Sequence, residues 1–339
     1  MSEILINLNN LKHNVSQIST KIGSVRKIIA VLKDNAYGHG LVLMAKELAN
    51  LGVRYACVRS IDEANDIKEF FDDILVLSHI PNGNENIDFT YAINDLSALE
   101  IIKENSKIHF AIDTLMHRNG ILQKDFELAC KIAKKRNLKL LGAYTHFRSA
   151  DENGSDYFAQ KMVYEKSKKS LKAVACKFGY ENLVFHSHNS AATNRAEKID
   201  DDFIRVGISL YGYNEFCDTL NLKPILSLWA NRVSKRVLKK GCCVGYGAKF
   251  CAKEDINIAT YDLGYADGLF RYNGNGELLI ENGKKLLGKM SMDSFSCEDS
   301  GEKICIFKDV TKWANFFNTI NYEILVKLSP RIKRKIVTE

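Results

Sequence analysis

Several polar side chains follow short apolar runs, and their types could carry out covalent and acid–base chemistry. Lys33 ends the run KIIAVL, and its amine could attack an aldehyde to form an imine. Ser190 follows the run LVFHS and offers a hydroxyl, whereas Gly207 and Ile208 follow the run FIRV and offer backbone N–H groups. A hydroxyl beside N–H groups near a helix start is typical of phosphate binding. A lysine amine opposite such a phosphate site suggests pyridoxal phosphate (PLP) held as a Schiff base.

These side chains need a scaffold that brings distant segments together, and eight strand-like runs supply it. The runs are short and apolar, as strands buried on both faces are, and they cover residues 27–32, 55–58, 74–77, 90–93, 108–113, 140–146, 183–187 and 203–206. Segments with helical spacing lie between them at 41–50, 62–70, 95–104, 124–135 and 156–178. Eight alternations predict an α/β fold with a parallel (β/α)8 TIM-type barrel. A doubly wound open sheet is the competing architecture.

The pattern of the sequence changes after residue 218. Short β-type segments follow at 228–237, 256–263, 277–280, 285–290 and 303–307, and glycine-containing turns separate them. This pattern predicts a C-terminal, mainly antiparallel β domain. We therefore expect two domains, residues 1–218 and residues 219–339.

Composition excludes several classes of protein. The 339 residues are 46% hydrophobic and 26% charged, which is ordinary for a globular protein. No segment approaches the ~20 apolar residues of a membrane helix. The first ten residues have no basic region followed by a long apolar core, so we expect a cytoplasmic protein.

The charge and the cysteines also narrow the function. Part of the net charge of +7 lies in residues 331–335, which we expect to form a solvated tail. No basic stripe interleaved with aromatic residues indicates a nucleic-acid partner. The nine cysteines include no CxxC pair, so we expect no metal site and no disulfide framework, only reduced thiols that mostly fill the core.

Taken together, the motifs resemble the alanine racemase family over nearly the whole chain. The most specific stretch is VLKDNAYGHG at residues 31–40, which is similar to the cofactor-lysine motif of that family. Further landmarks follow in the family's order: INLNNLKHN at 6–14, NSAA at 189–192, VGYGA at 244–248, GYADG at 264–268, MSMD at 290–293 and TINYE at 319–323. Each is weak alone, and together they are strong.

The resemblance implies a homodimeric PLP enzyme that interconverts L- and D-alanine and supplies D-alanine for peptidoglycan. Lys33 would hold the cofactor covalently and act as one base, and Tyr246 would be the second base, in the other subunit's site. The implied cofactor-binding residues are Lys33, Tyr37, His146, Asn189, Ser190, Arg205, Gly207, Ile208 and Tyr322. Arg118 and Met292 would bind the substrate carboxylate, with Asp293 and Tyr265 in supporting positions.

The chemistry explains these residue types. Racemisation removes the α-proton on one face and returns it on the other, so it needs two bases. A phenol is a weak acid, and we expect His146, hydrogen-bonded to Arg205, to help Tyr246 ionise. A guanidinium only donates hydrogen bonds, so Arg205 facing the pyridine nitrogen would keep that nitrogen unprotonated and suppress side reactions.

The sequence departs from the family at the substrate arginine. Leu115 stands where the family has glycine in Asp-Thr-Gly-Met-x-Arg, and Ala111 stands where many members carry a carbamylated lysine. We expect an anion or a nearby side chain to orient Arg118 instead, and less firmly. The segment after Tyr322 is only a partial match to the family.

Plainer interpretations stand beside these. Lys33 could be solvated, Ser190 could only cap a helix, Arg205 could be an ion-pair partner, and Tyr246 could be an exposed turn tyrosine. Other functions are a serine-type or broader racemase, a decarboxylase relative, or a non-catalytic PLP-binding protein. The VGYGA segment at 244–248 argues against the last two.

Overall fold

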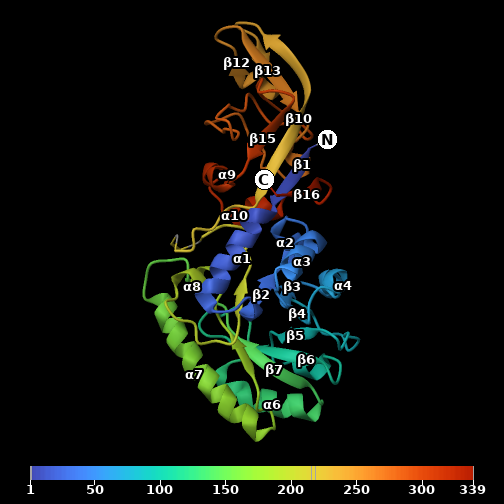
Figure 1. Ribbon diagram of the computed structural model, residues 1–339, viewed down its shortest axis with the longest axis vertical. Coiled ribbons are helices and arrows are strands. Elements are labelled where there is room, and N and C mark those ends of the chain that lie inside the picture. The colour runs from blue at the N-terminus through green and yellow to red at the C-terminus, as the bar shows by residue number, and fades with distance from the viewer. Residues whose placement is uncertain (1, 215, 218, 339) are drawn as a thin grey trace. The chain divides into compact units, whose positions relative to one another are not determined.

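The computed structural model describes residues 2–214, 216–217 and 219–338 (Figure 1). The chain divides into two compact units. The barrel unit comprises Lys12–Ala36 and Leu41–Leu222, and the β-rich unit comprises Met1–Leu11, Tyr37–Gly40 and Lys223–Glu339. The expected domain boundary between residues 218 and 219 stays a prediction. The first strand of the chain and the segment 37–40, which lie before that boundary in the sequence, belong to the β-rich unit.

The barrel unit contains one parallel sheet of eight strands. In chain order they are β2 (Ile28–Val31), β3 (Tyr55–Val58), β4 (Asp73–Val76), β5 (Thr90–Ile93), β6 (Lys107–Ala111), β7 (Lys139–Tyr144), β8 (Val184–His186) and β9 (Ile204–Val206). The spatial order is β8-β7-β6-β5-β4-β3-β2-β9. The two ends meet because the Phe203 and Arg205 amides donate to the carbonyls of Phe185 (3.3 Å) and His188 (2.8 Å). The expected barrel is confirmed, and the open sheet is excluded.

Continuous apolar runs made these strands recognisable, because nearly every strand residue is buried. The helices lie outside the strands in Figure 1. They are α1 (Leu8–Ile22), α3 (Leu41–Asn50), α4 (Ile61–Ile67), α5 (Ala98–Ile101), α6 (Phe126–Lys135), α7 (Asp156–Lys177) and α8 (Ser190–Arg195), with short 3-10 turns at Val25–Lys27 and Gln123–Asp125. The short segment α2 (Lys33–Tyr37) follows β2 and is not a regular helix.

Helix boundaries differ from the expected ones where a side chain supplies a better cap. Helix α4 begins at Ile61 because Ser60 caps it by accepting a hydrogen bond from the amide of Glu63. The helix expected at 95–104 is a single turn, α5. Helix α1 was not predicted, although its buried Leu11, Val15 and Ile18 show helical spacing.

The β-rich unit is built on a mixed sheet. Its strands are β1 (Glu3–Asn7), β10 (Leu226–Leu238), β13 (Ile256–Tyr261), β14 (Phe295–Glu298), β15 (Lys303–Phe307) and β16 (Lys333–Val337), in the order β14-β13-β10-β1-β16 with β15 also on β10. The hairpin β11 (Cys243–Val244) and β12 (Phe250–Cys251) stands apart, and α9 (Thr311–Phe316) and α10 (Asn321–Val326) complete the unit. All pairings are antiparallel except β1 with β16, which is parallel.

Two of the five expected β segments do not form strands. Segments 277–280 and 285–290 make only isolated bridges, from Leu279 to Lys285 and from Leu286 to Cys297. Gly276, Gly283 and Gly288 adopt positive φ around them, which interrupts extended backbone. Strand β14 was missed.

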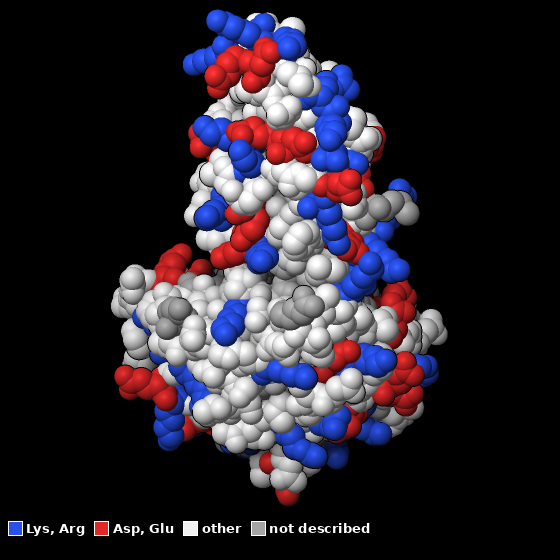
Figure 2. All heavy atoms as spheres, turned by 45° about the horizontal axis from the view of Figure 1, so that its top comes forward, with Lys and Arg blue, Asp and Glu red and all other residues white. Residues whose placement is uncertain are grey.

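The basic segment at 331–335 is not a solvated tail. It leads into β16, and Lys335 forms an ion pair with Glu3 on β1. Arg334 is half-buried, and its guanidinium donates to the carbonyl of Gly38 at 2.8 and 3.1 Å. The face of the molecule drawn in Figure 2 mixes acidic and basic side chains. No helix in the described residues is long and apolar enough to span a membrane.

The expectation that all nine cysteines are reduced is wrong for one pair. Cys243 and Cys251 face each other across β11 and β12 and form a disulfide. Their spacing of eight residues matches no sequence motif, because it is the hairpin register that brings the two side chains together. Cys57, Cys130 and Cys297 are buried free thiols, as expected.

Candidate active site

The loop after β2 carries Lys33 on an unusual backbone. Asp34, Asn35, Ala36 and Tyr37 adopt φ values of +54°, +56°, +51° and +53°, a left-handed turn. This conformation costs about 1–2 kcal/mol for each residue with a side chain. The Asn35 side chain offsets part of this cost by accepting from the amide of Leu41 at 2.8 Å. Strain of this kind concentrates at functional sites.

A buried arginine occupies the interior of the barrel. Arg205 Nη1 lies 2.7 Å from His186 Nδ1, and Nη2 donates to the carbonyl of Thr145 at 2.6 Å. The guanidinium also lies over the ring of Tyr144, 4.7 Å from its centroid. No carboxylate in the described part of the chain pairs with it, and burial lowers the pKa of Arg205. Neutral acceptors therefore hold this cation, and the ion-pair interpretation does not apply.

A hydrogen-bonded chain of two buried histidines, His186 and His109, extends from Arg205. These hydrogen bonds allow one arrangement of the ring protons. A guanidinium only donates, so His186 Nδ1 accepts and His186 Nε2 carries the proton. That proton is donated to His109 Nδ1 at 2.8 Å. Burial lowers the pKa of His109 to about 4 and holds the pKa of His186 well below its ordinary value. Both imidazoles are neutral, and the sequence analysis missed both because they lie within apolar strands.

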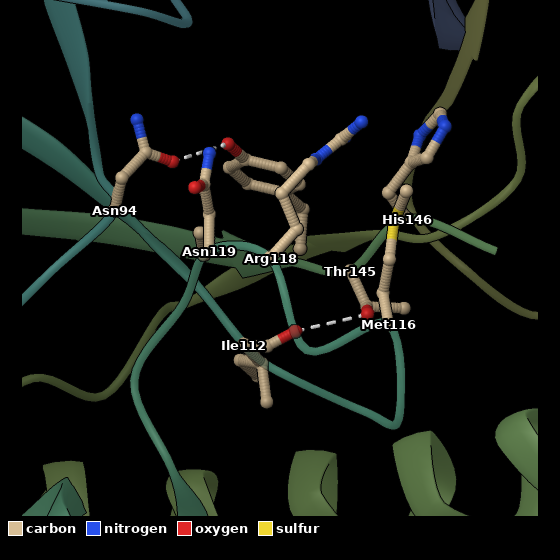
Figure 3. Close-up of a pocket in the computed structure, with 9 residues that line it drawn as sticks. Asn94, Ile112, Met116, Arg118, Asn119, Thr145 and His146 are labelled. Carbon is tan, nitrogen blue, oxygen red and sulfur yellow. Dashed lines mark hydrogen bonds between the residues drawn. The ribbon is translucent and has the colours of Figure 1, made fainter. Parts of the chain in front are cut away.

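The histidine that contacts Arg205 is His186, and not His146 as the sequence predicted. His146 makes no hydrogen bond to Arg205 in the described structure; His186 takes that position. His146 instead lines a pocket with Arg118 (Figure 3), and its side chain is exposed at the mouth of that pocket. Enclosure by the barrel, followed by the charges of Arg205 and Arg118, lowers the pKa of His146.

The pocket in Figure 3 surrounds Arg118 with neutral groups. It is lined by Asn94, Ala111, Ile112, Met116, Arg118, Asn119, Tyr144, Thr145 and His146. The small Ala111 side chain leaves the position of the family's modified lysine without a charge. Leu115 adopts φ +82°, a conformation that favours glycine, which explains why glycine is the usual residue there.

The segment after β8 forms a small cradle. The hydroxyl of Ser190 accepts from the amides of Gly207 at 3.3 Å and of Ser209 at 3.4 Å. Two N–H groups thus converge on one hydroxyl oxygen, and such a group of donors suits a phosphate. The position of the Ser209 amide was not predicted from the sequence, because it depends on the fold of this loop. The cofactor-binding roles of Gly207 and Ile208 stay predictions. Asn189, and not Ser190, caps α8 by accepting from the amide of Ala192 at 2.9 Å.

A buried carboxylate fixes the backbone before this cradle. Asp201 accepts from the amide and hydroxyl of Ser187 at 2.8 and 2.6 Å and from Lys168 at 2.6 Å. Against the effect of burial, the neighbouring His188 and the contacts with Lys168 and Ser187 hold the pKa of Asp201 below its usual range. The carboxylate therefore stays charged and anchors the turn that leads to Ser190.

The remaining predicted site residues belong to the β-rich unit. The Tyr37 ring lies 5.6 Å from the Tyr322 ring. The amides of Tyr265 and Ala266 donate to Ser291 and Met292, which brings the segments 264–268 and 290–293 together. Met292 and Asp293 are exposed, and Tyr246 is 63% exposed on the loop between β11 and β12. The roles of these residues stay predictions.

An eight-stranded barrel with polar strand ends, together with a β-rich unit, defines a two-unit protein of the TIM-barrel class. The family of alanine racemase N-terminal domains matches residues 6–215, and the family of alanine racemase C-terminal domains matches residues 225–336. The chain belongs to the alanine racemase family.

Relatives and solved structures agree with this assignment. An alanine racemase of Campylobacter concisus is 57% identical over 337 residues, which cover 99% of this chain and 100% of the relative. The structure of alanine racemase from Bacillus anthracis with bound L-Ala-P matches with a TM-score of 0.89 and 29% identity, over 99% of this chain and 95% of that one. Alanine racemase from Bartonella henselae with covalently bound pyridoxal phosphate shares the fold, with a TM-score of 0.85 and 23% identity over 99% of each chain.

Proposed function

We propose that this protein is an alanine racemase that interconverts L- and D-alanine with pyridoxal 5′-phosphate and supplies D-alanine for peptidoglycan. The observation that carries the proposal is the hydroxyl cradle at Ser190 on the same barrel as the strained lysine loop. The high identity to a relative with this name over the full length supports it.

The residues present fit the cofactor. A phosphate suits the Ser190 cradle, where two amides already converge on an oxygen. Lys33 would hold the cofactor covalently, with Tyr37 and Tyr322 as further contacts and Asn189 fixing the start of α8. When bound, PLP supplies an aldehyde for amino groups and a conjugated ring that withdraws electrons from Cα.

The buried arginine has a defined task in this proposal. Arg205 presents donors only, and His186 and Thr145 fix its orientation. A ring nitrogen placed against it stays unprotonated. The next residues in this hydrogen-bonded chain, His186 and His109, are neutral imidazoles, so they would supply no acidic proton to the ring nitrogen either.

Two residues would exchange the α-proton on opposite faces. Lys33 Nζ would take or return it on one face, and the Tyr246 hydroxyl on the other. Arg118 and the backbone N–H of Met292 would hold the substrate carboxylate. His146, Tyr265 and Asp293 would line and support the site. In this proposal Tyr246 comes from the second subunit of a cytoplasmic homodimer.

The test is chiral analysis of L-alanine and L-serine incubated with the purified protein and PLP, with detection of carbon dioxide. D-alanine formation is the expected result. Preferred turnover of serine would redirect the proposal to a broader racemase, carbon dioxide would indicate a decarboxylase, and no turnover would leave a non-catalytic protein. Lys33→Ala should abolish turnover, and Lys27→Ala, at an exposed lysine before the same strand, should not.

Sharing of sites between subunits has its own test. A Lys33→Ala variant and a Tyr246→Phe variant, each inactive alone, are unfolded together and refolded as a mixture. Partial recovery of racemase activity is expected, because mixed dimers contain one intact site. Absence of recovery would indicate sites built from a single chain.

A further inference from the structure

The disulfide of the β-rich unit closes the loop that carries Tyr246. Cys243 and Cys251 pair across β11 and β12, and the only other pair of this hairpin is Val244 with Phe250. The five residues between these inner partners are Gly245 to Lys249, and Tyr246 is the second of them. The covalent bond therefore lies one residue pair away from the base of the Tyr246 loop.

The loop itself has little else to hold it. Gly245, Gly247 and Ala248 all adopt positive φ, so the loop contains two glycines with wide conformational freedom. Within the described residues, the side chain of Tyr246 is mostly exposed and makes no hydrogen bond or ring contact. Restraint of this side chain therefore comes from the backbone of the loop, at its two ends and where Gly245 and Gly247 lie near Lys289.

Two features act on those ends. Val244 and Phe250 pack against a small cluster of Leu238, Ala252, Ile258 and Leu287, but both are only partly buried. The disulfide is the second feature, and it removes the freedom of β11 and β12 to separate. A hairpin of two residue pairs is marginal in water by itself, so the disulfide makes a large share of the restraint.

The disulfide is also open to chemical reagents. Cys243 and Cys251 are both exposed, and the free thiol of Cys242 is exposed directly beside Cys243. Disulfides are rare in reducing compartments, and strained or exposed disulfides are the labile and regulatory ones. An exposed disulfide next to a free thiol can be reduced by small thiols in solution.

We propose that Cys243 and Cys251 are positioning residues for Tyr246 and form a redox-sensitive switch on racemase turnover. A small dithiol attacks one sulfur, the S–S bond breaks through a mixed disulfide, and the second thiol of the reagent completes the exchange. The protein gains two S–H groups, and the dithiol becomes its cyclic disulfide. The freed hairpin then holds Tyr246 less firmly. This inference rests on the proposed role of Tyr246 as the second base.

The experiment compares the PLP-loaded enzyme before and after treatment with dithiothreitol, with alkylation and mass spectrometry to count thiols. Reduction should lower kcat about three- to tenfold, because small displacements of a reacting group are costly. The double variant Cys243→Ser/Cys251→Ser should show the same lower kcat and no response to dithiothreitol. Cys242→Ser removes the neighbouring thiol and serves as the matched control, with normal kcat and a normal response.

A second readout separates positioning of Tyr246 from a general structural effect. The two α-deuterated enantiomers of alanine are compared, because only one direction of the reaction uses the phenol to take the proton. Reduction should increase the kinetic isotope effect in one direction alone and leave the affinity for PLP unchanged. Equal changes in both directions, or weaker PLP binding, would overturn the positioning role.

The remaining outcomes also decide the question. An enzyme with D-alanine-forming activity but free thiols at both positions after air or diamide oxidation would overturn this inference and leave the proposed function intact. An oxidised enzyme whose kcat does not respond to reduction would do the same. A protein with the disulfide but no racemase activity would instead remove the proposed function.

Discussion

The guanidinium of Arg205 is held inside the barrel by the imidazole of His186, with Nη1 2.7 Å from Nδ1. His186 in turn donates to His109 at 2.8 Å and stacks on Tyr144 at 5.2 Å. A cation in the barrel interior thus rests on neutral acceptors, which fixes the tautomers of two histidines at once.

Replacement of His186 by Phe should be strongly destabilising. Phe keeps an aromatic ring for stacking on Tyr144 but removes the acceptor for Arg205, leaving a buried charged donor with fewer partners. We expect a loss of about 2–4 kcal/mol in the free energy of unfolding, measured by urea denaturation. The control His13→Gln, at a histidine outside the barrel interior, should change stability by less than about 0.5 kcal/mol. Equal stabilities of the two variants would contradict this arrangement.

The buried histidines predict a stability loss in mild acid. The pKa of His109 is lowered to about 4 in the folded barrel, whereas an unfolded imidazole titrates near 6.5. Between these pH values the unfolded chain binds a proton at His109 that the folded barrel does not bind. The contribution of His109 to the free energy of unfolding is therefore fully present above pH 6.5 and is lost as the pH falls towards 4. His109 should contribute about 3 kcal/mol to this loss.

The variant His109→Gln isolates this contribution. Carboxylates also titrate at low pH, so the quantity of interest is the difference between the wild type and the variant. Urea denaturation at several pH values between 7 and 4.5 should show a shallower decline for the variant. Parallel curves would mean that His109 does not remain neutral in the folded state.

Loss of the Ser190 hydroxyl should weaken cofactor binding more than stability. Ser190→Ala removes the oxygen on which the amides of Gly207 and Ser209 converge. We expect the Kd for PLP, from absorbance titration, to rise about tenfold, equivalent to about 1.4 kcal/mol. Ser24→Ala also removes a serine that accepts from a backbone amide and should leave the Kd unchanged. An unchanged Kd in Ser190→Ala would place the phosphate elsewhere.

Gly38 should tolerate no side chain. It has φ +81°, and a Cβ at this position would lie 2.0 Å from the carbonyl oxygen of Leu325. Gly23 has the similar φ of +83° with nothing within 4 Å, so Gly23→Ala measures the backbone cost alone, about 1 kcal/mol. Gly38→Ala should lose at least about 2 kcal/mol more in urea denaturation. Similar losses would show that the backbone near α10 moves away easily.

Local sequence patterns were enough to predict the barrel and the main candidate residues of the site. Strands buried on both faces leave continuous apolar runs, and reactive groups follow these runs, so Lys33, Ser190 and Arg205 could be found without coordinates. The matches to the family then extended the prediction to the β-rich unit.

Which groups come into contact could be seen only in the folded chain. Strand β1 joins β10 and β16, more than 200 residues away, and no local pattern encodes such a pairing. His186, and not His146, is the hydrogen-bond partner of Arg205. The amide of Ser209 joins that of Gly207 at the Ser190 hydroxyl, and Cys243 pairs with Cys251 through the register of a hairpin. Local sequence sets backbone preference and burial, whereas the direction of each side chain depends on packing across the whole chain.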